Sequence, residues 1–187
     1  GLVEAYSLLP ERIRKNSAML FVGDGASLPS LKKKCDDLGI GEDEVVFTGR
    51  VPHEEVNSLY SIIDIAPIPR SSLPVTEMVS PMKPFEAMSM EKLVVVSSVD
   101  ALDEIVDDGK NGRIFLKDDI EDLSRVLLDC IEDNKMRISI GQDSRDWVIE
   151  NRSWDKISSL IPEIFSTDAN LATVSGSISQ AVRPGTL

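Results

Sequence analysis

The chain has 187 residues, of which 42% are hydrophobic and 28% are charged, and its formal net charge is −12. This composition is ordinary for a soluble globular protein with one domain and room for a tail. The acidic balance argues against nucleic-acid binding, which needs a clustered basic surface, but it permits a small anion held by a few local groups. No apolar run approaches the roughly 20 residues of a membrane span and no signal-peptide pattern opens the chain, so the default expectation is a cytoplasmic protein without a transmembrane segment.

Strands and helices are expected to alternate along the chain, after an opening helix over residues 1–16. Five short and mainly apolar runs are expected strands: Ala18–Gly23, Val45–Thr48, Ile62–Ile68, Leu93–Ser97 and Gly112–Leu116. Further helices are expected at 28–38, around 56–60, within 80–92, around 103–106, and at 120–132, 135–150 and 154–165. This order predicts an α/β protein with a Rossmann-like, doubly wound parallel sheet in three layers.

Two regions of the chain are expected to lack regular structure. Pro69–Ser80 is polar and marked by prolines, which is typical of a loop. Residues 166–187 are rich in small and polar residues with little periodicity, so they are predicted to be a disordered tail or a crossing segment. The compact domain is therefore expected to end at about residue 165.

Neither the cysteines nor the single histidine indicates a metal site. Cys35 and Cys130 lie far apart on helical apolar patterns, which favours two reduced core thiols over a disulfide. No group of histidine, cysteine and acidic residues has metal-ligand spacing, so no structural metal is expected.

Ligands of open α/β sheets bind beyond the carboxyl ends of the strands. The segments at this edge are expected to be Gly23–Ala26, Gly49–Val51, Pro69–Ser80 and the chain from Ser98 onward. Near this edge, prolines and charged residues precede an apolar run in the stretch VSPMKPFEAMSMEKLVVVSS, from Val79 to Ser98.

The start of a helix in this stretch is predicted to bind an anion. Either Ser80 caps the helix or Pro84 marks its first position. Free backbone N–H groups at the positive end of the helix dipole attract a phosphate, and Lys83 adds a full charge. The groups expected there belong to Met82, Lys83, Phe85 and Glu86. The alternative is a helix start whose Glu86 merely stabilises the dipole.

Several longer stretches, in this order, resemble the C-terminal domain of GT-B glycosyltransferases, and more narrowly the large retaining family with a paired-glutamate motif. They are VVFTGRVPHEEVNSLYSIIDIAPIPR, TEMVSPMKPFEAMSMEKLVVVSSVDALDEIVDDGKNGRIF and RDWVIENRSW, and the resemblance runs from Gly1 to Phe165. It implies a domain that binds a nucleotide-diphosphate sugar, such as a UDP-, GDP- or ADP-sugar, with no other cofactor. A separate N-terminal domain would hold the acceptor, with catalysis in the cleft between the two.

The resemblance also implies roles for individual residues. Glu86 matches the glutamate that binds the ribose hydroxyls, and Glu77 is the best match for the glutamate that contacts the donor sugar, although eight residues separate the two here instead of seven. Lys83 is expected near the diphosphate, so Glu77 and Lys83 are the candidate catalytic residues. Residues 49–51 match the turn that cradles the base. The donor-binding candidates are therefore Glu86, Gly49, Arg50, Val51, Met82 and Phe85, followed by Gly23, Arg70 and Ser80.

In the family, a central strand before the first helix carries an arginine and lysine phosphate clamp, and this chain begins on the helix. The expectation is a fragment of a longer transferase that is inactive alone, while a strand supplied by another chain is the alternative. The missing domain also offers a route to peripheral membrane association. Two other functions stay open: a non-catalytic nucleotide-binding partner module and a GT-B epimerase acting on a UDP-sugar.

Overall fold

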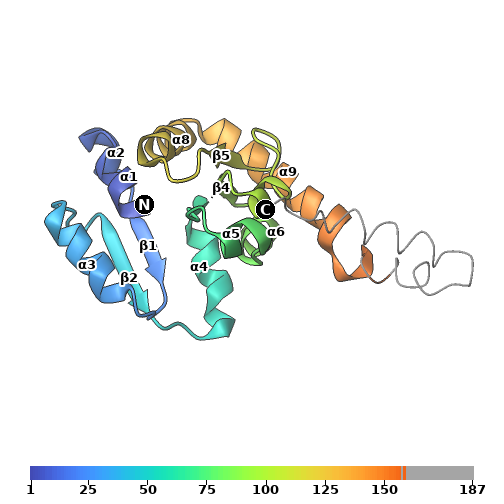
Figure 1. Ribbon diagram of the computed structural model, residues 1–187, viewed down its shortest axis with the longest axis horizontal. Helices are drawn as coiled ribbons and strands as arrows, with labels where there is room; N and C mark the ends of the chain where they lie inside the picture. The colour runs from blue at the N-terminus through green and yellow to red at the C-terminus, as the bar shows by residue number, and fades with distance from the viewer. Residues whose placement is uncertain (157, 159–187) are drawn as a thin grey trace, which may run out of the picture. The chain divides into compact units, whose positions relative to one another are not determined.

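The computed structural model describes residues 1–156 and 158 (Figure 1). The strands are β1 (Met19–Val22), β2 (Val45–Gly49), β3 (Ile65–Ile68), β4 (Leu93–Ser97) and β5 (Arg113–Phe115). The helices are α1 (Leu2–Ser7), α2 (Glu11–Arg14), α3 (Leu28–Asp37), α4 (Val56–Ile62), α5 (Pro74–Met78), α6 (Lys83–Ser89), α7 (Asp100–Asp103), α8 (Ile120–Glu132) and α9 (Asn134–Arg152), and η1 (His53–Glu55) is one 3-10 turn. The chain divides into a compact unit, Gly1–Val148, which contains all of these strands, and a second unit, Ile149–Leu187.

Strand β4 lies at the centre of the core and separates two apolar clusters. It pairs in parallel with β3 and with β5, and each of its five residues is buried. Leu93 and Val95 belong to a cluster that includes residues of α1 and α8, whereas Val94 and Val96 belong to a cluster that includes residues of α6 and α7. A strand that is apolar on both faces is typical of a parallel sheet covered by helices on both sides. The predicted three-layer, doubly wound architecture is confirmed.

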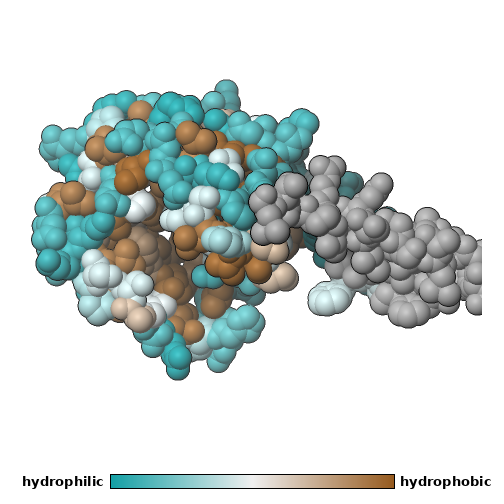
Figure 2. All heavy atoms as spheres, in the orientation of Figure 1, coloured by the Kyte–Doolittle hydropathy of each residue, from teal (hydrophilic) through white to brown (hydrophobic). Residues whose placement is uncertain are grey.

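The parallel strands of the described residues form two sheets. β1 pairs with β2 in one sheet, and β3, β4 and β5 form the other. Both sheets contribute to one core, since Met19 of β1 and Val45 of β2 share a cluster with Leu93 of β4. Among the described strands, none pairs with the second edge of β1 or of β3. Figure 2 shows a hollow with apolar walls in the middle of this part of the molecule.

Several predicted boundaries are wrong. The opening helix is two helices, because Pro10 has an extended backbone and caps α2 instead of continuing α1. The third strand begins at Ile65, since Ile62 ends α4 and is 70% exposed. The turn expected around residues 103–106 is α7, three residues earlier.

The predicted loop Pro69–Ser80 contains a helix, α5. Pro74 occupies its first turn, where the missing N–H is no loss, and the hydroxyl of Thr76 accepts a hydrogen bond from the backbone N–H of Leu73. Of the helix expected at 154–165, residues 154–156 and 158 are helical. The remainder, like the expected tail at 166–187, lies outside the described residues.

Both cysteine thiols are free and buried, as predicted. Cys35 is 2% exposed and Cys130 is 0% exposed. Burial raises the pKa of both thiols, that of Cys130 to about 11, because a thiolate loses its hydration in an apolar environment. We expect neither thiol to react with a water-soluble disulfide reagent at pH 8 in the native protein, and both to react in denaturant. Rapid labelling of either thiol in the native chain would contradict this prediction.

A candidate donor site at the carboxyl ends of the strands

The turns after β1 and β2 lie against each other. The backbone N–H of Gly23 donates to the carbonyl oxygen of Gly49 at 2.9 Å. Gly49 has a φ of +68°, a left-handed conformation that glycine adopts without steric cost. Arg50 follows with an 84% exposed side chain and pairs with Asp24 at 3.6 Å. An ion pair this exposed is weak, so the guanidinium is available to a ligand.

Helix α6 begins at Lys83, with Met82 as its N-cap and Pro84 in its first turn. Pro84 therefore lies in the first turn, one residue after the first helical position. The alternative that Ser80 is the N-cap is wrong, because the helix begins three residues after it. Lys83 and Glu86 are both exposed. Their three-residue spacing places both side chains on one face of α6.

The two charged side chains of α6 differ in their surroundings. Within residues 1–156 and 158, the Lys83 ammonium makes no hydrogen bond or ion pair, and the Glu86 carboxylate accepts a hydrogen bond from the hydroxyl of Tyr60 at 3.3 Å. Burial, and then the negative charge of Glu86, raise the pKa of Tyr60 to about 12, so this hydroxyl stays a donor. Phe85 packs inward and stacks on Trp147 at 6.5 Å between ring centroids, which leaves only its backbone for a ligand.

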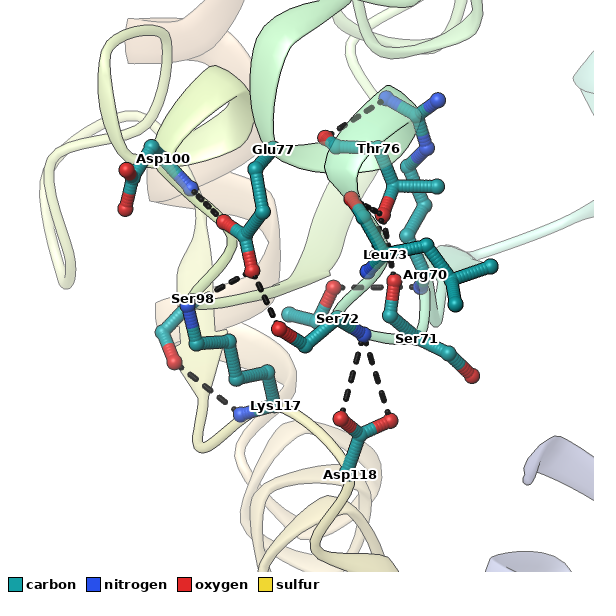
Figure 3. Close-up of polar contacts among 11 residues, drawn as sticks. Arg70, Ser71, Ser72, Leu73, Thr76, Glu77, Ser98, Asp100, Lys117 and Asp118 are labelled. Carbon is teal, nitrogen blue, oxygen red and sulfur yellow. Dashed lines mark hydrogen bonds and ion pairs between the residues drawn. The ribbon is translucent and has the colours of Figure 1, made fainter. Parts of the chain in front are cut away.

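Glu77, on α5, joins the segments that follow three different strands (Figure 3). Its carboxylate accepts hydrogen bonds from the Ser72 hydroxyl at 2.6 Å and from the Lys117 ammonium at 2.7 Å. The backbone N–H of Asp100 is a third donor, at 2.8 Å. The segments after β3, β4 and β5 therefore converge on one carboxylate. Glu77 and Glu86 lie on different helices, although Glu77 was expected to lie in a loop.

Arg70, predicted to contact either the donor or an acidic partner, binds backbone carbonyls in this structure. Its guanidinium donates to the carbonyl oxygen of Val79 at 2.6 Å and to that of Thr76 at 3.4 Å (Figure 3). Its own backbone N–H donates to the hydroxyl of Ser97 at 3.1 Å. Arg70 thereby closes residues 70–79 into a compact segment.

Sequence reasoning missed three residues of this region: Tyr60, Lys117 and Asp118. Tyr60 lies in the helix expected around residues 56–60, where nothing in the sequence distinguishes it from an apolar packing residue. Lys117 and Asp118 lie in the link between β5 and α8, where charged residues are common. No sequence motif includes Lys117 or Asp118. The one sequence signal for them is the position of this link beyond the end of β5.

The Glu77 carboxyl group is expected to stay ionised far into the acid range. Its hydrogen bonds with Lys117, Ser72 and the Asp100 N–H lower its pKa from 4.5 to about 2. A pKa that is lowered in the folded state adds stability above pH 4.5, and this contribution is lost as the pH falls from 4.5 through 2. We expect the Glu77 carboxyl carbon, followed by NMR, to titrate near pH 2. A midpoint near 4.5 would contradict the contacts.

A cavity of about 440 Å³ lies elsewhere, beside the turn between α7 and β5. Its charged lining residues are Asp103, Glu104, Asp107 and Asp108. Four acidic side chains repel a diphosphate, so this cavity is a poor donor site.

Two further features are absent from the part of the chain that the structure describes. No group of three or more histidine, cysteine and acidic side chains is arranged to hold a metal ion. Of the described helices, none is both long enough and apolar enough to cross a bilayer.

Several known proteins are similar to this chain in sequence. The family described as glycosyl transferases group 1 matches residues 1–147. An uncharacterized glycosyltransferase of Methanocaldococcus jannaschii is 31% identical over 171 residues, which are 91% of this chain and 42% of that protein. The GDP-mannose-dependent alpha-(1-6)-phosphatidylinositol monomannoside mannosyltransferase of Mycolicibacterium smegmatis is 27% identical, over 84% of this chain and 42% of that protein. The chain thus spans about two fifths of the length of these relatives.

Solved structures share the fold. Anabaena HepE in complex with UDP aligns with a TM-score of 0.76 and 21% identity, over 88% of this chain and 44% of HepE. A sucrose-phosphate synthase from Thermosynechococcus elongatus aligns with a TM-score of 0.74 and 20% identity, over 88% of this chain and 40% of the synthase.

Proposed function

The chain belongs to the family of glycosyl transferases group 1, and we propose that it forms the donor-binding part of a retaining glycosyltransferase. The donor is a nucleotide-diphosphate sugar, and no other cofactor takes part. The acceptor is held by polypeptide outside this chain, because the relatives are more than twice as long. This chain alone is therefore expected to bind donor without transferring the sugar. The cytoplasmic location, with any membrane contact made through the acceptor-binding part, stays a prediction.

The observation that carries this proposal is the pair of charged side chains on one face of α6. Lys83 is exposed and its ammonium has no partner in the described residues, so it is free to bind a diphosphate. Glu86, one turn later, is a carboxylate suited to accept hydrogen bonds from ribose hydroxyls. Arg50 and the Gly49 turn are proposed to contact the base.

Catalysis would depend on stabilising the diphosphate as it leaves the sugar, since negative charge develops on that group. Lys83 would supply a positive charge there. Glu77 would accept a hydrogen bond from a sugar hydroxyl: two carboxylate oxygens offer about four acceptor positions, and three are filled. We assign no protein nucleophile.

A further strand is proposed to lie between β1 and β3. Both strands have an unpaired edge, both belong to one core, and such edges readily accept another strand. Polypeptide outside this chain would supply the strand, together with the arginine and lysine phosphate clamp that the family resemblance implies.

The proposal is tested by calorimetric titration of the folded chain with UDP, GDP and ADP. The two most informative ligands are UDP, present in the HepE complex, and GDP, the nucleotide of the mannosyltransferase donor. We expect saturable binding of one nucleotide with a Kd on the order of 1 mM or tighter. A chain that is folded by circular dichroism and binds none of the three at this level would refute donor binding by this chain.

The role of Glu86 predicts a selective loss of affinity. We expect Glu86→Gln to weaken binding of the preferred nucleoside diphosphate about 10-fold, because hydrogen bonds to a charged acceptor contribute about 1.5–3 kcal/mol. The 2′,3′-dideoxy form of the same nucleotide lacks the ribose hydroxyls, so its affinity should not change. An equal loss for both ligands would mean that Glu86 acts on the site only indirectly.

A further inference from the structure

The segment Arg70–Val79 is not held in place by burial of apolar side chains. Its large hydrophobic residues point to solvent: Leu73 is 54% exposed, Val75 59%, Met78 82% and Val79 51%. A segment gains little from the hydrophobic effect when its apolar surface stays in water. Its position must therefore be fixed by polar contacts.

Two neighbouring residues of the β5–α8 link supply contacts of opposite charge to this segment (Figure 3). The Lys117 ammonium binds the Glu77 carboxylate at 2.7 Å. The Asp118 carboxylate accepts from the backbone N–H of Ser72 at 3.1 Å. We call Lys117 and Asp118 together the bracket.

The bracket is itself held in a defined conformation. The backbone N–H of Lys117 donates to the hydroxyl of Ser98 at 3.0 Å, at the end of β4. Asp118 has a φ of +62°, which is uncommon for a residue other than glycine but is tolerated by aspartate. The link is thus turned so that both side chains reach the same segment.

We propose that Lys117 is a positioning residue that, with Asp118, holds the segment Arg70–Val79 against the strand ends so that Glu77 faces the sugar of a bound donor. This inference rests on the proposed function and adds to it a residue that touches no substrate. The Lys117–Glu77 pair differs from an ordinary surface pair, because its side chains are 33% and 19% exposed and the carboxylate has two further donors. The carboxylates of Asp100 and Asp118 also act on this ammonium: after Glu77, their negative charges raise the pKa of Lys117.

The bracket can be tested without ligand by exchanging Lys117 for methionine, which keeps the length of the side chain and removes its charge. We expect the amides of Ser72 and Asp100 to exchange with deuterium at least about 10-fold faster in Lys117→Met. The reason is that the carboxylates that accept from these amides, those of Asp118 and Glu77, would no longer be held in place. The pKa of Glu77 should move up toward its ordinary value, and Lys117→Arg should restore both properties in large part. The control is Lys15→Met, which removes an ion pair of the same 2.7 Å length whose side chains are both 71% exposed.

A second arm compares ligands with and without the sugar, using UDP and UDP-glucose or, if guanine is preferred, GDP and GDP-mannose. We expect Lys117→Met to bind the nucleoside diphosphate within about 2-fold of the wild type and to lose the additional affinity that the sugar contributes. A uniform loss for both ligands would reduce Lys117 to a general stabilising residue and overturn the proposal.

A failure of the bracket and a failure of the proposed function would give different results. Unchanged amide exchange and an unchanged Glu77 pKa in Lys117→Met, with nucleotide binding intact, would overturn the bracket and leave the proposed function standing. A wild-type chain that binds no nucleotide would overturn the proposed function, and with it the role in sugar positioning, whatever the exchange data show.

Discussion

Replacing Lys83 by alanine is expected to weaken binding of the preferred nucleoside diphosphate about 10- to 100-fold. The ammonium has no partner among the described residues, so its interaction with a diphosphate would not be offset by the loss of another contact. Hydrogen bonds that involve charged groups contribute about 1.5–3 kcal/mol, which corresponds to this range in affinity. Calorimetric titration of the wild type and the variant measures the change directly.

The choice of ligand makes this experiment specific for the diphosphate. The corresponding nucleoside lacks the phosphates, so its affinity should be the same for the wild type and Lys83→Ala. Lys83→Arg keeps the charge and should keep most of the affinity. Lys15→Ala removes a lysine that pairs with Glu11 outside the site and controls for the change in net charge. Equal affinities of the wild type and Lys83→Ala for the diphosphate would exclude Lys83 from the phosphate site.

The elements that sequence predicted best are those whose apolar pattern is decided by burial. Strand β4 matches its predicted bounds, Leu93–Ser97, because all five residues are buried and the run ends where the chain turns into α7. Helix α8 also matches, Ile120–Glu132, because the Asp119 side chain caps it and buried residues recur on one stripe. In both cases the local signal and the tertiary packing agree.

The errors arose where a proline or a polar side chain decides the local conformation. Proline breaks the opening helix at residue 10, where the backbone is extended. The same residue type starts a helix at Pro74, because there it occupies the first turn and Thr76 completes the cap. Composition alone does not distinguish the two places, since each contains a proline. Whether a helix ends or begins there depends on the position of the proline within the turn.

The candidate site also has one part that the sequence predicts and another that it does not. Lys83 and Glu86 could be predicted to share a face, because three residues on one helix fix their relation. The contacts of Glu77 with Lys117 and Asp100 join residues that are 40 and 23 positions apart. Those contacts depend on how the ends of β3, β4 and β5 come together, which the spacing of residues in one sequence does not encode.

Exchanging Gly141 for alanine is expected to destabilise the protein by about 1 kcal/mol. A Cβ atom at this position would lie 2.3 Å from the backbone oxygen of Glu91, so α9 and the turn between α6 and β4 would have to move apart. Overpacking of this kind costs about 1–3 kcal/mol, and a backbone oxygen cannot escape by changing rotamer. Alanine stabilises a helix interior by about 1 kcal/mol relative to glycine. This gain lowers the net loss of folding stability without reversing its sign.

Urea denaturation of Gly141→Ala, beside Gly25→Ala as the matched control, measures this difference. A Cβ atom at Gly25 would meet no atom within 4 Å, so that variant should be neutral or slightly stabilised by the lower entropy of its unfolded chain. Because the Glu91 turn connects α6 to β4, the strain in Gly141→Ala should also reach the face that carries Lys83 and Glu86, and nucleotide binding should weaken along with stability. If Gly141→Ala proved as stable as its control, α9 could not pack against the Glu91 carbonyl as closely as the structure shows.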